Sequence, residues 1–333
     1  MNKLQSNHKP ERILIIKTGW SEILHEEPRS RKCSLGDVFR TTVLLNLYKN
    51  DNVTWLTDEK SKPLLENNSY IKDLISINPN GYVDPLVIEE LKCRIFDTII
   101  NLEKDPGLCA LVQSIRAWKN YGFRLDSETG IVKAFERSLN VLSLSSKHNL
   151  KKQNKKTAQE LLYEIVGAKW NGEPYILGYK PTTKEKYDVG FNTIVGQKWP
   201  SKAWKLENWD SLERLLLSAK FSITRQEKQP EEVLKNLHSY IDWLNSCKII
   251  VSNDSLGLHL ALALNKKVIG IFGSTNAAEV YPYNHSILLT PNKYIKRACI
   301  PCFESNCKYI FSCINSIKPK IIKKKIIKEL NHN

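Results

Sequence analysis

Short apolar runs alternate with longer stretches of helical period along most of the chain. In the first half the runs cover residues 13–16, 53–56, 74–77 and 95–102, and helical patterns follow at 37–48 and after Pro106. The second half repeats the scheme, with runs at 187–191, 221–224, 248–251, 268–272 and 287–289. Strands that alternate with helices form parallel sheets covered by helices. The pattern predicts an α/β fold with two Rossmann-like domains.

The domain limits follow from changes in this pattern. Residues 178–186 are polar, contain Pro181 and lack periodicity, which is typical of a linker. We therefore expect an N-terminal domain at 1–178 and a C-terminal domain at 179–313. In 314–333, isoleucines and Leu330 recur on one side and lysines on the other. This predicts an amphipathic, basic terminal helix that packs back across the domains.

The net charge of +15 raises the question of an anionic partner. Lysines cluster at 147–156 and 318–328, but neither cluster contains interleaved aromatic residues or a nucleic-acid motif. We therefore expect no nucleic-acid partner. The lysine clusters are explained by solvated helix faces, and contact with anionic lipid or an acidic acceptor is the alternative. Residues 1–12 lack an apolar signal core, and no apolar run approaches the ~20 residues of a membrane helix. A cytoplasmic protein is expected.

Residues 252–275 carry the strongest local signal. Asp254 and Ser255 follow an apolar run, and Leu258, Leu260 and Leu264 then recur at helical spacing, so the segment predicts strand, turn and helix. The free N–H groups of a helix start bind anions. The next strand ends at Gly273 beside this point, and ligands bind where such strand ends converge.

Two common nucleotide motifs are absent. Neither domain has G-x-G-x-x-G after its first strand, and there is no Walker A motif. Two Rossmann-like domains without these motifs point to a sugar-nucleotide enzyme with its site in the interdomain cleft.

Four segments resemble glycosyltransferase family 9, the ADP-heptose heptosyltransferases. Ser34-Leu-Gly-Asp37 is similar to the family's S-x-G-D motif, and Asp254 and His259 have its D-x4-H spacing. Residues 202–209, KAWKLENW, are similar to its K-x-W-P-x-x-x-W stretch, with Lys205 in place of the proline. The cysteines resemble a cluster common near the family's C-terminus; they are Cys299, Cys302, Cys307 and Cys313.

The resemblance implies the GT-B fold, with two parallel sheets facing across a cleft. It implies that Asp37 is the general base of an inverting transfer, which needs a carboxylate to take the acceptor hydroxyl's proton. The alternative for Asp37 is a helix N-cap, which contributes ~1 kcal/mol.

The resemblance also implies a set of donor-binding residues in the C-terminal domain. Lys202 would meet the donor pyrophosphate, with Lys198 or Lys205 as a substitute. Asp254 and His259 would lie against sugar and diphosphate. An ordinary surface lysine and an N-cap are the alternatives for Lys202 and Asp254. Leu256 stands where the family often has glycine, which displaces the glycine to 257. The remaining residues of this set are Ser255, Gly257 and Leu258. Asn192 and Thr193 are candidates for a different reason: they follow the first strand of the second domain and can donate hydrogen bonds to phosphate, with ordinary turn residues as the alternative.

The cysteines and one insertion complete the candidate chemistry. The four C-terminal cysteines can ligate zinc or iron, and free structural thiols are the alternative. Cys33, Cys93, Cys109 and Cys247 are isolated and are expected to be core or surface thiols. Residues 18–32 are longer than the family's usual connection to S-x-G-D; His25, Glu26 and Glu27 there either touch substrate or form a solvated lid.

The resemblance therefore predicts a metal-independent inverting heptosyltransferase without a required cofactor. Its donor would be ADP-heptose or another nucleotide sugar, and its acceptor a lipopolysaccharide core or related bacterial glycan. Peripheral contact with the cytoplasmic face of the inner membrane is expected. The rival hypotheses are a sugar-nucleotide epimerase of similar architecture and a non-catalytic sugar-nucleotide-binding protein.

Overall fold

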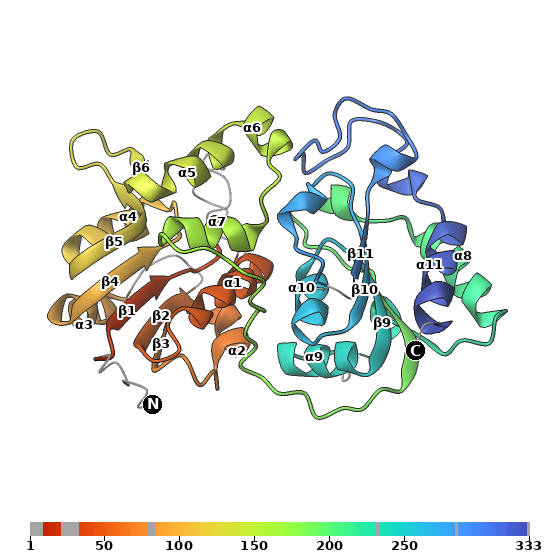
Figure 1. Ribbon diagram of the computed structural model, residues 1–333, viewed down its shortest axis with the longest axis horizontal. Helices are drawn as coiled ribbons and strands as arrows, with labels where there is room; N and C mark the ends of the chain where they lie inside the picture. Colours follow the sequence, from red (N-terminus) through yellow and green to blue (C-terminus); the bar gives the residue numbers. More distant parts are fainter. Residues whose placement is uncertain (1–8, 21–32, 79–83, 231–233, 284–285, 332–333) are drawn as a thin grey trace, which may run out of the picture. The chain divides into compact units, whose positions relative to one another are not determined.

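A computed structural model of the protein describes residues 9–20, 33–78, 84–230, 234–283 and 286–331. The chain forms two compact units (Figure 1). The first comprises residues 1–146 and 162–178, and the second comprises 147–161 and 179–333. The chain thus passes from one unit to the other three times. Each unit is built on its own sheet.

The first unit contains a six-stranded sheet in the order β3-β2-β1-β4-β5-β6. All neighbouring strands are parallel except β5 and β6. Its strands are β1 (Arg12–Ile16), β2 (Asn52–Asp58), β3 (Asp73–Ile77), β4 (Ile95–Asn101), β5 (Arg116–Leu125) and β6 (Val132–Ala134). The helices here and in the following segment are α1 (Leu35–Thr41), α2 (Lys62–Leu65), α3 (Pro85–Cys93), α4 (Pro106–Ser114), α5 (Leu139–Ser146), α6 (His148–Gln153) and α7 (Ala158–Ile165).

Two helices of the first unit begin at Asp-Pro pairs. The Asp84 carboxylate accepts from the backbone N–H of Leu86 at the start of α3, and Asp105 does the same for Gly107 at the start of α4. Proline at the first helical position has a preset φ and no N–H to satisfy. These pairs therefore fix where the two helices begin.

The second unit contains a five-stranded parallel sheet in the order β11-β10-β9-β7-β8. Helices α9 and α10 lie against one face, and α8 and α11 against the other (Figure 1). The strands are β7 (Tyr187–Asn192), β8 (Ile223–Arg225), β9 (Cys247–Asn253), β10 (Lys267–Ile271) and β11 (Ser286–Leu289). The helices are α8 (Leu206–Leu217), α9 (Leu237–Asn245), α10 (Leu256–Ala263) and α11 (Pro319–Asn331).

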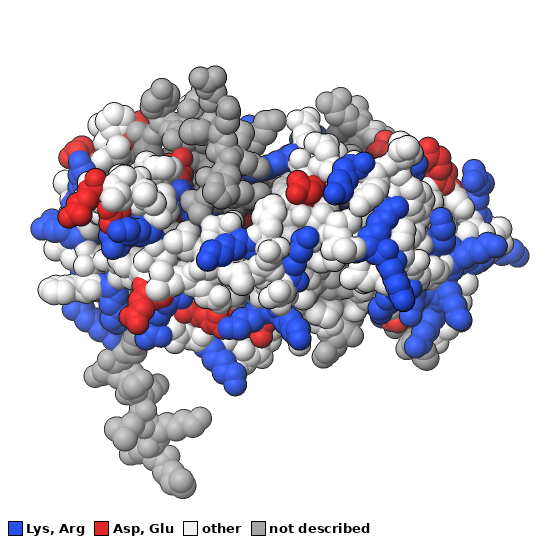
Figure 2. Space-filling view, turned by 90° about the horizontal axis from the view of Figure 1, so that it is seen from above, with Lys and Arg blue, Asp and Glu red and all other residues white. Residues whose placement is uncertain are grey.

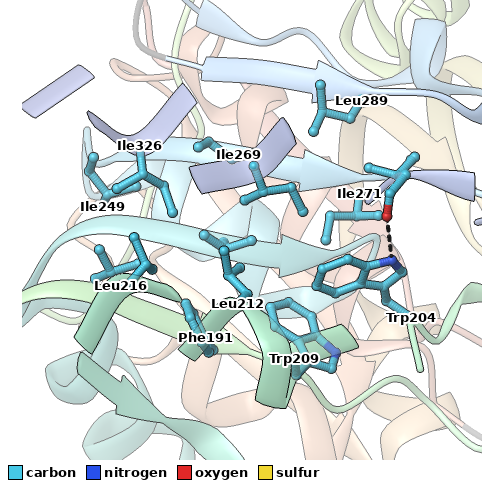
Figure 3. Packing of buried hydrophobic residues seen from close by; sticks show 14 of the residues in the cluster. Phe191, Trp204, Trp209, Leu212, Leu216, Ile249, Ile269, Ile271, Leu289 and Ile326 are labelled. Atoms are coloured by element: carbon cyan, nitrogen blue, oxygen red, sulfur yellow. Dashed lines mark hydrogen bonds between the residues drawn. The ribbon is translucent and has the colours of Figure 1, made fainter. Parts of the chain in front are cut away.

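The core of the second unit joins β-strands to α8 and α11 (Figure 3). Trp204 and Trp209 are buried and meet edge to face, with ring centroids 4.9 Å apart. The Trp204 indole donates to the backbone oxygen of Ile317 at 3.0 Å, so its polar atom is satisfied inside the core. Ile322 and Ile326 of α11 are fully buried in the same cluster. The terminal helix is thus an integral part of this unit.

The α/β architecture with two largely parallel sheets is confirmed. Two elements differ from expectation: α1 is shorter than the helix predicted at 37–48 and continues as a 3-10 turn (Thr42–Asn46), and the hairpin β5–β6 was not predicted. Strand β5 lacks a continuous apolar run because only Gly122 and Phe123 are buried in it. Residues 147–161 group with the second unit, whereas the sequence pattern placed them in the first domain. His25, Glu26 and Glu27 lie outside the described residues.

Candidate active site

Polar residues gather at the carboxyl ends of β7, β9 and β10. The register pairs Asn192 with Ser252 and Asn253 with Ile271, so these three strands end at the same edge of the sheet. The strand order reverses between β7 and β9, because the chain runs from β7 to β8 on one side and returns to β9 on the other. Ligands of open α/β sheets bind at such switch points.

Lys202 and Asp254 form an ion pair at this edge. The ammonium lies 3.0 Å from the carboxylate, and the two side chains are 20% and 11% exposed. The hydroxyl of Thr275, just after β10, donates to the same carboxylate oxygen at 2.7 Å. Burial acts to raise the pKa of Asp254, but Lys202, His259 and Thr275 together hold it well below its ordinary value. Two motifs about fifty residues apart thus meet in one charged cluster.

A buried amide network supports the start of α10. The Asn192 side chain is fully buried and donates to Ser252 at 2.7 Å and Ser255 at 2.8 Å. It accepts from the Tyr240 hydroxyl at 2.5 Å. A Cβ at Gly257 would lie 2.1 Å from that hydroxyl, so only glycine fits here. Ser255 is the N-cap of α10, and the N-cap alternative for Asp254 is therefore wrong.

The other predicted donor residues lie around this network. His259 is 4% exposed, and Leu258 is fully buried in the core. The hydroxyl of Thr193 contacts Glu227, which also pairs with the buried Arg225. Lys198 is partly buried in the loop between β7 and α8. Direct contact of these residues with a donor stays a prediction.

The cysteine-rich segment, residues 299–313, packs beside Lys202. The Ser201 hydroxyl is hydrogen-bonded to the Ser274 hydroxyl at 2.9 Å and to the backbone oxygen of Glu304 at 2.6 Å. The backbone N–H of Ser201 donates to the backbone oxygen of Ser305, and the backbone N–H of Phe303 donates to the backbone oxygen of Ser274. The segment therefore holds the turn that carries Lys202 against the end of β10.

The four thiols of this segment differ in exposure. Cys313 is buried, and the other three are partly buried. Burial and the neighbouring cysteines raise the pKa of Cys313 to about 11. Within the described ranges, no three His, Cys, Asp or Glu side chains are arranged to hold a metal ion.

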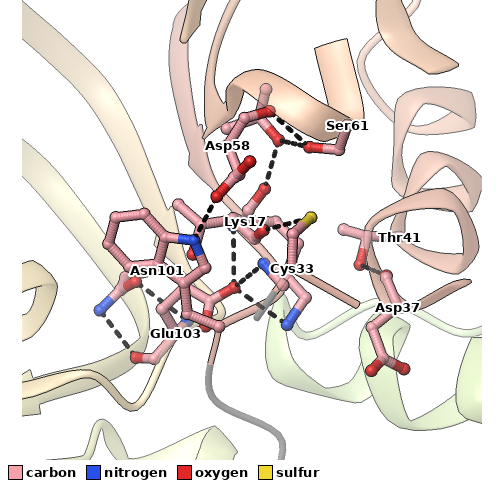
Figure 4. Close-up of polar contacts among 12 residues, drawn as sticks. Lys17, Cys33, Asp37, Thr41, Asp58, Ser61, Asn101 and Glu103 are labelled. Atoms are coloured by element: carbon pink, nitrogen blue, oxygen red, sulfur yellow. Dashed lines mark hydrogen bonds and ion pairs between the residues drawn. The ribbon is translucent and has the colours of Figure 1, made fainter. Parts of the chain in front are cut away.

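A second polar cluster lies at the switch point of the first sheet, between β1 and β4 (Figure 4). The Glu103 carboxylate, which is fully buried, accepts from the backbone N–H groups of Thr18 at 2.8 Å and Gly19 at 2.7 Å. It also pairs with Lys17 at 3.1 Å. Asp58, at the end of β2, accepts from the Trp20 indole at 2.6 Å. The cluster fixes the turn that follows β1.

Asp37 is held by this turn through α1. The Gly19 carbonyl accepts from the N–H of Ser34 at 2.8 Å, and Ser34 is the N-cap of α1. Asp37 therefore occupies the first turn, and the N-cap alternative for it is wrong. Its carboxylate contacts Arg40 and is 13% exposed. A carboxylate in a first helical turn is stabilised by the helix dipole.

Several residues of both clusters were not predicted from the sequence. Glu103 follows the apolar run of β4, and a charged residue at the end of a buried strand is a signal that could have been used. Thr275 and Ser201 give no such signal, because only the fold brings them to Asp254 and Ser274.

Two units with polar clusters at the switch points of their sheets are the architecture of a GT-B glycosyltransferase. The family model of glycosyltransferase family 9 (heptosyltransferase) matches residues 87–310, and the chain belongs to this family. No curated protein matches the chain significantly by sequence.

Solved structures of the same fold cover nearly the whole chain. A glycosyltransferase family 9 protein from Veillonella parvula is 17% identical with a TM-score of 0.64, covering 97% of this chain and 98% of its own. Escherichia coli heptosyltransferase WaaC with ADP-2-deoxy-2-fluoro heptose is 17% identical with a TM-score of 0.59, covering 95% and 99%. The iron-containing dodecameric glycosyltransferase TibC of enterotoxigenic E. coli is 12% identical with a TM-score of 0.57, covering 97% and 77%.

Among the described residues, no helix has both the length and the apolar character needed to cross a bilayer.

Proposed function

We propose that the protein is an inverting heptosyltransferase that uses ADP-heptose. The observation that carries this proposal is the Lys202–Asp254 pair, 3.0 Å apart, at the switch point beside the start of α10. An ammonium, a carboxylate and a helix start in one place match the diphosphate and the hydroxyl groups of a nucleotide sugar. The solved structure of WaaC with ADP-2-deoxy-2-fluoro heptose supports this choice of donor.

On the donor side, Lys202 exchanges its partner. In the free protein its charge is compensated by Asp254, and a bound diphosphate competes for the same ammonium. Asp254 can then accept hydrogen bonds from the sugar hydroxyls. As the C1–O bond to the diphosphate breaks, Lys202 and the N–H groups at the start of α10 stabilise the charge that develops on ADP.

On the acceptor side, the first unit binds the glycan and Asp37 acts as the general base. The acceptor hydroxyl oxygen attacks C1 from the face opposite to ADP, and Asp37 takes its proton. The bond from the acceptor oxygen to C1 forms while the bond from C1 to the diphosphate breaks, so the configuration at C1 inverts. We propose a lipopolysaccharide core or a related bacterial glycan as the acceptor.

The transfer proposed here needs no metal or other cofactor, because Lys202 supplies positive charge beside the leaving diphosphate. Since TibC is described as iron-containing, this point needs its own test. Activity should be unchanged after dialysis against a chelator, with the metal content measured before and after. If the chelator abolishes transfer and added metal restores it, the enzyme is not metal-independent. The four C-terminal cysteines would then be the first candidates for the metal ligands.

We propose a cytoplasmic enzyme that makes peripheral contact with the inner membrane, where glycolipid acceptors are assembled. The excess of Lys and Arg over Asp and Glu, 50 against 35, favours contact with an anionic surface.

The Asp37→Asn variant tests the base. We expect transfer to fall at least about a hundredfold, the usual scale of general-base catalysis. ADP-heptose binding, measured by calorimetry, should stay within about twofold. The matched control is Asp97→Asn, whose carboxylate pairs with Arg12 near the amino end of the same sheet and should leave transfer unchanged. Full transfer by Asp37→Asn would overturn the assignment, and conversion of the donor alone would indicate an epimerase.

A further inference from the structure

Three consecutive large apolar side chains are exposed in the cysteine-rich segment. The exposed fractions are 44% for Tyr309, 106% for Ile310 and 39% for Phe311. In the described part of the chain, no other three consecutive large apolar residues are exposed. Exposing a continuous apolar patch is unfavourable in water and typically marks a binding surface. Ile310 in particular is fully exposed and does not pack into the protein's own core.

Cations surround these side chains. The Arg297 guanidinium lies 4.5 Å from the centre of the Tyr309 ring and donates to the backbone oxygen of Phe311 at 2.7 Å. The ammonium of Lys308 lies 5.6 Å from the Tyr309 ring, and that of Lys318 lies 5.5 Å from the Phe311 ring. The apolar patch therefore has a rim of three positive charges.

A hollow of about 410 Å³ adjoins this rim. It is lined by Asn292, Ile295, Lys296, Arg297 and Ala298. Between 292 and 320 the sequence contains six Lys or Arg residues and one carboxylate, that of Glu304. Figure 2 shows blue side chains over much of the face that it draws, with fewer red ones. The surroundings of the patch thus favour an anionic ligand.

We propose that residues 309–311, with Arg297, Lys308 and Lys318, form a docking surface for a bilayer that contains anionic phospholipid. Ile310 enters the acyl boundary, the two aromatic rings lie at head-group level, and the cations and the hollow meet lipid phosphates. This arrangement matches the positions that apolar, aromatic and basic residues take at membrane interfaces. Nucleic acid is a poorer match, because a fully exposed isoleucine adds nothing to phosphate binding.

The docking surface is connected to the proposed donor site through the cysteine-rich segment. Ser201, next to Lys202, hydrogen-bonds to Glu304 and Ser305 of this segment. Docking would therefore place the donor site near the bilayer. The inference extends the proposed membrane contact, but it concerns lipid binding alone and is tested without donor or acceptor.

The test is co-sedimentation of the full-length protein with vesicles of phosphatidylcholine containing about a third phosphatidylglycerol. We expect binding to these vesicles, weakening with salt, and little binding to pure phosphatidylcholine. Ile310→Ser should weaken binding about tenfold. The double variant Lys308→Gln/Lys318→Gln should weaken it about thirtyfold. The exposure of Ile310 means that its substitution should leave the melting temperature unchanged, which circular dichroism can check.

Two controls separate this surface from general stickiness. Ile131→Ser removes an isoleucine that is 61% exposed in the first unit, and Lys324→Gln/Lys328→Gln removes two exposed cations of α11 that lie outside residues 292–320. Both should bind vesicles like the unchanged protein. Three results would overturn the proposal. The first is that Ile310→Ser binds vesicles as well as the unchanged protein does. The second is that the α11 variant loses as much vesicle binding as Lys308→Gln/Lys318→Gln, and the third is that the protein binds single-stranded RNA but not vesicles. Failure of lipid binding with intact transfer would leave the proposed chemistry standing.

Discussion

Glu103 holds a buried negative charge on which the position of Asp37 depends. Its carboxylate binds Lys17 and two backbone N–H groups, and the same turn binds Ser34 at the start of α1. We therefore regard Glu103 as a positioning residue. It acts on the proposed base through the backbone, without itself touching substrate.

The Glu103→Gln variant should be both less stable and less active. It leaves the Lys17 ammonium buried without its counter-charge, which costs roughly 3 kcal/mol of unfolding free energy, measurable in urea. Transfer should fall while ADP affinity is unchanged, because the donor residues belong to the second unit. Glu89→Gln is the control, since the Glu89–Lys92 pair is exposed and contributes little. Unchanged stability in Glu103→Gln would contradict the role of the buried charge.

Asp254 gives a pH dependence with a definite sign. Because its pKa is lowered in the folded protein, ionised Asp254 stabilises the fold above its ordinary value of 3.8, and this contribution is lost as the pH falls below that value. The Asp254→Asn variant should therefore be less stable than the unchanged protein at pH 7, by at most about 3 kcal/mol. Urea unfolding at several pH values should show this difference shrinking below about pH 4. A difference that grows on acidification would contradict the lowered pKa.

At the scale of elements, the start of α10 depends on one glycine. The Cβ of Gly257→Ala would overlap the Tyr240 hydroxyl and the Asn192 amide, so the network below Ser255 must move. Overpacking of this kind costs about 1–3 kcal/mol. ADP affinity, measured by calorimetry, should fall with it. Gly196→Ala, where the added Cβ meets open space at an ordinary φ, is the control and should retain both. Normal ADP binding by Gly257→Ala would show that this hydrogen-bond network does not support the donor site.

The elements that could be predicted from the sequence are those whose own residues form a clear hydrophobic pattern. Strands β1, β9 and β10 contain continuous apolar runs because helices cover both faces of a parallel sheet. Strand β5 was missed because polar residues interrupt its apolar ones and few of its residues are buried, and its place is fixed by pairing with β4 and β6. The resemblance implied that Lys202 and Asp254 both lie at the donor, but not that they form an ion pair. The contribution of Thr275 depends on the register of β9 and β10.

At the scale of the whole molecule, each unit has its own core and sheet. If ADP binds only to the second unit, it stabilises that unit by mass action. Scanning calorimetry should then resolve two unfolding transitions, of which ADP raises only one. Lys202→Ala should abolish this shift, and Asp37→Asn should preserve it. A shift of both transitions together would contradict independent units.

The burial of α11 in the second core bears on the order in which the protein is synthesised. All residues of the first unit have been made once residue 178 has been added, so that unit can fold while translation continues. The second unit takes residues 147–161 from the middle of the chain and Ile322 and Ile326 from α11. The sheet face that α8 and α11 share therefore stays only partly covered until the ribosome has passed those isoleucines. The proposed acceptor-binding unit therefore exists in folded form before any donor can be held.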